Sequence, residues 1–258
     1  MKQISFSSEG GVHIDIEKKI ARVTFFHPSS NALPKKVLSE LAEQIIDCGK
    51  NEHVSIIILQ SYGNKAFCAG ASFDELSTIT TSEEGLVFFS GFANVINAIR
   101  TCGKIVIGRI QGKAVGGGVG LASAVDYCFA METAAIKLSE IAVGIGPFVI
   151  GPAVERKAGI SAFSQMALKA HSFFDAKWAK ERGIYTEIYN NLDEMDFAIN
   201  AFAELLVNSN PEALSELKKI FWQGTENWNQ LLIERAKISG TLVLSDFTIQ
   251  SIQKFKQK

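Results

Sequence analysis

The 258-residue sequence lacks several features that would assign it to a simple class of protein. Its 26 basic and 27 acidic side chains nearly cancel, so it has no excess of positive charge that would favour binding to nucleic acid. Its four cysteines are widely spaced and include no C-x-x-C pair, which favours reduced thiols over a disulfide framework. The N-terminus has no apolar segment typical of a secretion signal, and no apolar run approaches the roughly 20 residues that span a bilayer. We therefore expect a cytoplasmic protein that binds neither nucleic acid nor membrane.

The sequence also lacks the spacings of several common catalytic sites. Its four histidines are far apart and none has the spacing of a metal ligand, so we expect no metal site. The G-x-S-x-G signature of serine hydrolases is absent. The glycine-rich segment 112–121 has no Lys-Ser/Thr of a phosphate-binding loop, and Leu121 replaces the third glycine of G-x-G-x-x-G.

The hydrophobic pattern indicates an α/β fold. Residues 12–16 and 20–26 predict a β-hairpin, and the apolar runs 54–60 and 104–110 predict buried strands, with helical spacing between them. Strands that alternate with helices are typical of α/β folds. From about Asp193 onward the pattern is helical only, and no linker rich in Pro, Gly or Ser precedes it. We expect this C-terminal region to be docked on the core rather than to form an independent domain.

Three consecutive glycines, Gly116–Gly118, lie between a predicted strand and a predicted helix. Such a run often marks close packing of backbone against backbone, and the glycines alone favour that interpretation. Alternatively, the N–H of Gly117, at a helix N-terminus, could converge with the N–H of Ala71 on one oxygen atom. Two such donors would form an oxyanion hole that polarises a carbonyl group. The residues by themselves leave both interpretations open.

Three segments of the chain resemble the enoyl-CoA hydratase/isomerase (crotonase) superfamily, in matching order and separation: KAFCAGASFDEL, QGKAVGGGVGLASAVDYCFA and AAIKLSEIAVGIGP. The resemblance extends over essentially the whole chain. It implies a spiral of repeated β-β-α units over residues 1–192 and a C-terminal helical region, 193–258, that assembles homotrimers or dimers of trimers. It also implies an acyl-CoA thioester as substrate, so that coenzyme A enters as part of the substrate and no separate cofactor is expected.

The resemblance further implies the residues of a site. Ala71 and Gly117 would supply the two N–H groups of the oxyanion hole, and Glu140 would be the catalytic carboxylate. A base in a dry pocket would have a raised pKa. Without the resemblance, a glutamate at a strand end such as Glu140 would be interpreted as solvated or as paired with a lysine such as Lys137. The residues expected to bind substrate are Asn31, Ala32, Leu33, Ala69, Gly70, Gly116, Phe148, Lys254 and Phe255.

Aromatic residues outside these motifs have two interpretations each. Phe88, Phe89 and Phe92 recur at helical spacing, which is typical of a hydrophobic core but would also suit the wall of an acyl pocket. Phe148 could exclude water from the site or belong to the core. Trp222 and Trp228 could face a neighbouring subunit or the substrate.

One departure from the family pattern bears on the reaction. The hydratases of the family carry two glutamates, and at the position of the first this sequence has Gly120. Adding water requires a second acid–base partner, whereas moving a double bond requires only one base that takes a proton and returns it. The preferred interpretation is therefore a 3-enoyl to 2-enoyl-CoA isomerase, and a glutamate at position 120 is expected to raise hydration. The alternatives are a hydratase that uses one glutamate on a branched or functionalised substrate, a catalytically weak acyl-CoA-binding relative, and thioester hydrolysis or decarboxylation.

Overall fold

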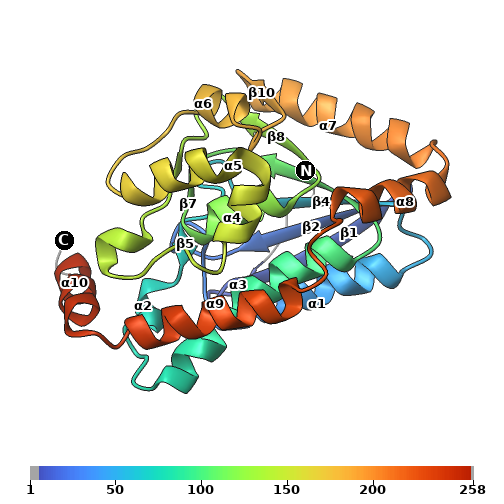
Figure 1. The fold of residues 1–258 in the computed structure, drawn as a ribbon. Helices are drawn as coiled ribbons and strands as arrows, with labels where there is room; N and C mark the ends of the chain where they lie inside the picture. The colour runs from blue at the N-terminus through green and yellow to red at the C-terminus, as the bar shows by residue number, and fades with distance from the viewer. Residues whose placement is uncertain (1–5, 257–258) are drawn as a thin grey trace.

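The structure, a computed structural model, describes the backbone of residues 6–256 and the side chains of residues 6–254. A six-stranded sheet with the order β1-β2-β4-β6-β8-β10 lies at its centre (Figure 1). β1 and β2 are antiparallel, and the other neighbours in this sheet are parallel. Its strands are β1 (Gly11–Glu17), β2 (Ile20–Phe26), β4 (Ile56–Ser61), β6 (Ile105–Ile110), β8 (Tyr127–Met131) and β10 (Glu187–Tyr189).

The predicted hairpin is confirmed, and its turn is tight. Lys18 and Lys19 both have positive φ angles, 49° and 63°, which is the backbone of a type I′ turn between twisted strands. The buried strands expected at 54–60 and 104–110 are also confirmed, as β4 and β6. Both are nearly fully buried along their length, because parallel strands between helical layers have no solvent-facing side.

Helices surround the sheet, with α1 and α3 on one side and α7 on the other (Figure 1). A short 3-10 helix, η1 (Glu140–Val143), lies near α4 and α5 in the chain. The helices are α1 (Lys35–Lys50), α2 (Phe73–Leu76), α3 (Ser82–Thr101), α4 (Gly117–Ala124), α5 (Gly151–Leu168), α6 (Ala176–Glu181), α7 (Leu192–Val207), α8 (Pro211–Phe221), α9 (Trp228–Leu242) and α10 (Asp246–Lys256). The α/β fold predicted from the sequence is confirmed.

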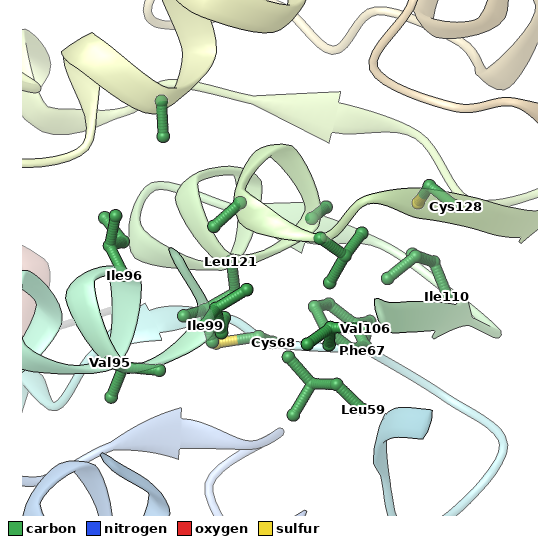
Figure 2. Packing of buried hydrophobic residues seen from close by; sticks show 14 of the residues in the cluster. Leu59, Phe67, Cys68, Val95, Ile96, Ile99, Val106, Ile110, Leu121 and Cys128 are labelled. Carbon is green, nitrogen blue, oxygen red and sulfur yellow. The ribbon is translucent and has the colours of Figure 1, made fainter. Parts of the chain in front are cut away.

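The hydrophobic core anchors the loop that precedes the site. Phe67 and Cys68 are fully buried, and Figure 2 shows them between Leu59 of β4, Val106 of β6 and Leu121 of α4. Cys68 also pairs with Ala114 in an isolated parallel bridge, and the N–H of Val115 donates to its carbonyl at 2.9 Å. The loop after Cys68 therefore starts from a fixed position.

The C-terminal helices pack on the rest of the chain through a buried polar network at Asp126. Its carboxylate accepts hydrogen bonds from the N–H of Val106 at 2.7 Å, from Lys218 Nζ at 2.6 Å and from Trp222 Nε1 at 2.9 Å. Trp222 and Trp228 are both buried and meet edge-on, with ring centroids 5.7 Å apart. The expectation that these tryptophans face a neighbour or the substrate was therefore wrong, since they join α8 and α9 to the core of their own chain.

Candidate active site

Two short parallel sheets bring the loops of the site together. β3 (Ala32–Leu33) pairs with β5 (Gly70–Ala71), and β7 (Ala114–Val115) pairs with β9 (Ile136–Lys137). The first sheet orients the strand that carries Ala71, and the second carries the chain into α4 on one side and into η1 on the other. Three segments that are distant in the sequence therefore meet at one place.

The N–H of Ala71 points away from β3. The N–H of the next residue, Ser72, donates to Leu33 O at 3.2 Å. Successive residues of a strand direct their N–H groups to opposite sides. The N–H of Ala71 therefore points toward α4. Gly70 permits this approach, since a Cβ at its position would lie 2.9 Å from Val115 O and 3.6 Å from Gly117 N.

Gly117 is the first residue of α4, so no carbonyl of its own helix accepts its N–H. The positive end of the helix dipole lies at the same point. The ring of Phe92 from α3 packs against Gly117, and a Cβ there would lie 2.1 Å from Phe92 Cε1. Close packing and an available N–H group thus occur at the same residue, so the two interpretations of the glycine run do not exclude each other.

Ala71, Gly117 and Glu140 line one cavity of about 70 Å³. Most of the other residues that line it are apolar, from α2, α3 and the segment 143–150: Leu76, Phe89, Phe92, Val143, Ile145, Phe148, Val149 and Ile150. Glu140 is the only ionisable side chain among the described residues that line it. The cavity therefore combines two backbone N–H groups with a single carboxylate in apolar surroundings.

The carboxylate of Glu140 is buried beside the glycine run. A Cβ at Gly116, whose φ is +53°, would lie 3.0 Å from Glu140 Oε1. Glu140 Oε2 is buried without a hydrogen-bond partner, and within residues 6–254 Glu140 forms no ion pair with Lys137 or any other cation. Desolvation raises the pKa of Glu140 to about 7, although hydrogen bonds from the backbone N–H groups of Glu140 and Ser139 partly oppose it. The direction agrees with that expected for a base in a dry pocket.

Ile150 occupies the space next to Gly120. A Cβ at Gly120 would lie 2.4 Å from Ile150 Cγ2 and 2.6 Å from Ile150 Cβ. Separations under about 3 Å require the neighbour to move, and here the neighbour is a buried branched side chain. A glutamate at position 120 would collide with Ile150 unless that side chain moved, and the effect of this change on hydration stays a prediction.

A wider cleft of about 680 Å³ adjoins the inner cavity and shares Ala69, Ala71, Phe73, Ser139 and Val143 with it. Ser29, Ser30 and Ala32 form one of its sides. Its ionisable lining residues are Lys137, His171, Lys254 and Asp74. The two spaces together form a broad outer cleft that leads into a narrow apolar cavity.

The structure brings most of the expected site residues to these two spaces. Those that line the inner cavity are Ala69, Gly70, Ala71, Gly116, Gly117, Glu140 and Phe148, and those that line the outer cleft include Ala32 and Lys254. Asn31 and Leu33 line neither. The side chain of Asn31 accepts from the N–H of His27 and donates to Tyr62 O and Ala66 O, while Leu33 is fully buried in the core. The side chain of Phe255 lies outside the described residues.

Sequence reasoning missed several residues that line the inner cavity. Ile150 is the most consequential, and it gave no signal because its contact with Gly120 exists only once the 146–150 turn has formed. Two of the three phenylalanines at helical spacing, Phe89 and Phe92, line the cavity, while Phe88 is buried in a small cluster beneath α10. Ser239 reaches the cavity from α9.

Comparisons with known proteins agree with this arrangement. Residues 15–258 match the family model described as enoyl-CoA hydratase/isomerase, and the chain belongs to this family of enzymes, which act on CoA thioesters. It is 28% identical over 234 residues to the peroxisomal Delta(3,5)-Delta(2,4)-dienoyl-CoA isomerase of Arabidopsis thaliana, covering 83% of this chain and 82% of the relative. It is 30% identical over 234 residues to the mitochondrial methylglutaconyl-CoA hydratase of Homo sapiens, covering 88% and 68%.

Comparison with solved structures agrees with the family match. An enoyl-CoA hydratase from Bacillus halodurans superposes with a TM-score of 0.87 at 21% identity, covering 94% of this chain and 99% of that one. The predicted crotonase-like fold is therefore confirmed. Within residues 6–256 no group of three or more His, Cys, Asp or Glu side chains could hold a metal, and no described helix is long and apolar enough to cross a membrane.

Proposed function

We propose that this protein is an enoyl-CoA isomerase that moves a double bond between the 3- and 2-positions, with Glu140 as its single base. The proposal rests on one observation: the inner cavity has a single buried carboxylate, and the place of the second glutamate of the family's hydratases is filled by an apolar side chain. Glu140 is the one ionisable group among the described residues that line the inner cavity, and Ile150 occupies the space beside Gly120.

The proposed reaction begins with the thioester oxygen held by the N–H groups of Ala71 and Gly117. Glu140 removes a proton from C2 of the 3-enoyl ester, and negative charge develops on the thioester oxygen between the two donors. The C3–C4 double bond becomes a C2–C3 double bond as the protonated Glu140 returns the proton to C4. Loss of one oxyanion donor typically costs about 10²–10³ in rate, so the two backbone N–H groups are part of the proposed catalytic machinery.

The raised pKa of Glu140 suits this exchange. A base that must both accept and return a proton works best when its pKa is close to the working pH, and burial brings the pKa of Glu140 to about 7. The apolar walls also limit the access of water to the intermediate, which would otherwise compete for the proton.

The outer cleft is the proposed site of the CoA moiety. Lys137 and Lys254 line it, and their ammonium groups could pair with phosphate oxygens of the nucleotide part. Ala32, Ala69 and Gly70 offer backbone groups along the same path, whereas the internal hydrogen bonds of Asn31 make its side chain a structural element of that loop. A homotrimer or dimer of trimers in the cytoplasm, assembled through residues 193–258, remains the expected form of the enzyme.

The test is an incubation of the purified protein with a 3-enoyl-CoA and, separately, with its 2-enoyl isomer, followed by mass spectrometry and NMR. We expect interconversion of the two esters without a change in mass. Gain of one water by the 2-enoyl ester would make the protein a hydratase, in line with its methylglutaconyl-CoA hydratase relatives, and would refute the isomerase. Tight binding without turnover of either ester would identify an acyl-CoA-binding relative.

The matched variant is Glu140→Gln, which keeps the shape of the side chain but cannot carry the proton. We expect it to lose turnover and still bind the ester, because the donors at Ala71 and Gly117 are unchanged. Isomerisation at the wild-type rate in this variant would refute the assignment of Glu140.

A further inference from the structure

The far wall of the inner cavity is built on a tight turn. The N–H of Phe148 donates to Gly146 O at 2.8 Å, which folds the phenyl ring back over its own turn. A Cβ at Gly146 would lie 2.4 Å from Phe148 Cζ, so the ring rests directly on the glycine. Pro147 between them is buried and has a restricted φ angle. Phe148 is therefore held in place as part of the wall.

Ile150 completes this wall from the start of α5. The N–H of Val154 donates to Ile150 O at 3.1 Å, and the N–H of Gly151 donates to Pro147 O at 2.9 Å. These bonds hold the backbone on both sides of Ile150, while its side chain fills the space over Gly120. The backbone that carries both side chains is therefore held by local hydrogen bonds.

The volume inside this wall is small. An apolar cavity of about 150 Å³ accommodates the six carbon atoms of benzene, so about 70 Å³ has room for about three. With the thioester carbonyl at the entrance, between Ala71 and Gly117, the acyl group would have about four carbon atoms in total. The outer cleft, at about 680 Å³, imposes no comparable limit.

The charges of the residues that line the inner cavity also restrict which acyl groups can bind there. Among the described residues, the inner cavity has no cationic side chain, and its one ionisable group is the carboxylate of Glu140. An acyl group that ended in a second carboxylate would bury a negative charge without a partner, beside another carboxylate. Burial of an unpaired charge costs several kcal/mol, which is enough to exclude such a substrate.

From the fixed wall, the small volume and the single carboxylate of the inner cavity, we infer that the substrate is an enoyl-CoA with a short, uncharged acyl group of about four carbon atoms. Phe148 and Ile150 set this limit as specificity-determining residues. The inference rests on the proposed function, because it takes the inner cavity as the acyl site. It predicts discrimination against acyl groups with a distal carboxylate, such as methylglutaconyl-CoA.

The experiment measures kcat/KM for a series of straight-chain 3-enoyl-CoA esters from butenoyl to decenoyl, and for methylglutaconyl-CoA. Either reaction, isomerisation or hydration, serves as the readout. We expect butenoyl-CoA to be the best substrate of the wild type, with a loss of about 10-fold or more by octenoyl-CoA, since even one misplaced methylene typically costs about 10-fold or more. Phe148→Ala should raise the octenoyl-to-butenoyl ratio of kcat/KM by about 10-fold or more.

The matched control is Phe197→Ala, which removes the same ring from an exposed position on α7. It should leave the ratio unchanged. If Phe148→Ala fails to fold, Phe148→Leu and Ile150→Val make smaller changes to the same wall and should shift the ratio in the same direction.

Three results would overturn the inference: decenoyl-CoA turned over as well as butenoyl-CoA, methylglutaconyl-CoA preferred over both, or equal ratios in Phe148→Ala and Phe197→Ala. Failure of the proposed function gives a different pattern, in which no ester is turned over. In that case calorimetric binding of the same esters to wild type and to Phe148→Ala ranks the acyl groups without catalysis, and a preference for long esters refutes the inference.

Discussion

The buried carboxylate of Glu140 predicts that removing its charge stabilises the protein while it abolishes activity. Burial raises the pKa of Glu140 from 4.5 to about 7 in the folded state. Below pH 4.5 the group is protonated in both the folded and unfolded chains and makes no difference between them. As the pH rises toward 7 the unfolded chain loses the proton first, so the free energy of unfolding falls, and it levels off above about 7.

The size of this effect follows from the pKa shift. The interval from 4.5 to about 7, at about 1.4 kcal/mol per pKa unit, gives a loss of about 3 kcal/mol above pH 7. Glu140→Gln has nearly the shape of the protonated acid and never ionises, so it escapes this loss. The free energy of unfolding of Glu140→Gln should therefore equal that of wild type below pH 4.5 and exceed it by about 3 kcal/mol above pH 7.

Urea unfolding of both proteins across this pH range, followed by tryptophan fluorescence, measures the difference directly. Groups that titrate equally in both proteins cancel in the comparison. Glu155→Gln makes the same substitution at an exposed position on α5 and is the matched control. A difference between Glu140→Gln and wild type that is the same at both ends of the range would refute the raised pKa and, with it, the dry pocket.

Three further predictions test other parts of the structure. The kcat/KM of wild type should rise with pH through about 7, as Glu140 loses its proton, and a flat profile across that range would contradict its role as the base. Asp126→Asn should lower the free energy of unfolding by about 3–5 kcal/mol, measured in urea, because it leaves Lys218 buried without its partner; an effect below about 1 kcal/mol would show that the pair is dispensable. Gly120→Ala should destabilise the protein by about 1–3 kcal/mol through its contact with Ile150, and a double-mutant cycle with Ile150→Ala should show that the two changes compensate; additive effects would mean that the two side chains do not compete for space.

The sequence predicted those features whose causes are local. The hairpin, β4 and β6 followed from periods of two and from continuous apolar runs, and α1 (Lys35–Lys50) from the helical spacing between the predicted strands. Motif resemblance located the loops at Ala71, Gly117 and Glu140, but not their neighbours. The contact between Ile150 and Gly120, like the pairing of Trp222 with Asp126, joins residues far apart in the chain, and no local pattern encodes it.

The glycine run shows why two interpretations of one motif could both hold. Each glycine faces a different neighbour: Gly116 the carboxylate of Glu140, Gly117 the ring of Phe92, and Gly118 the carbonyl of Cys68, 2.5 Å from where a Cβ would be. Close packing on three sides fixes the direction of the Gly117 N–H, which no carbonyl of α4 accepts. An oxyanion donor must be held in place before the reaction, because it stabilises the developing negative charge best when it does not have to reorient. Tight packing around the glycines is therefore the physical cause of the proposed catalytic geometry rather than a competing explanation for it.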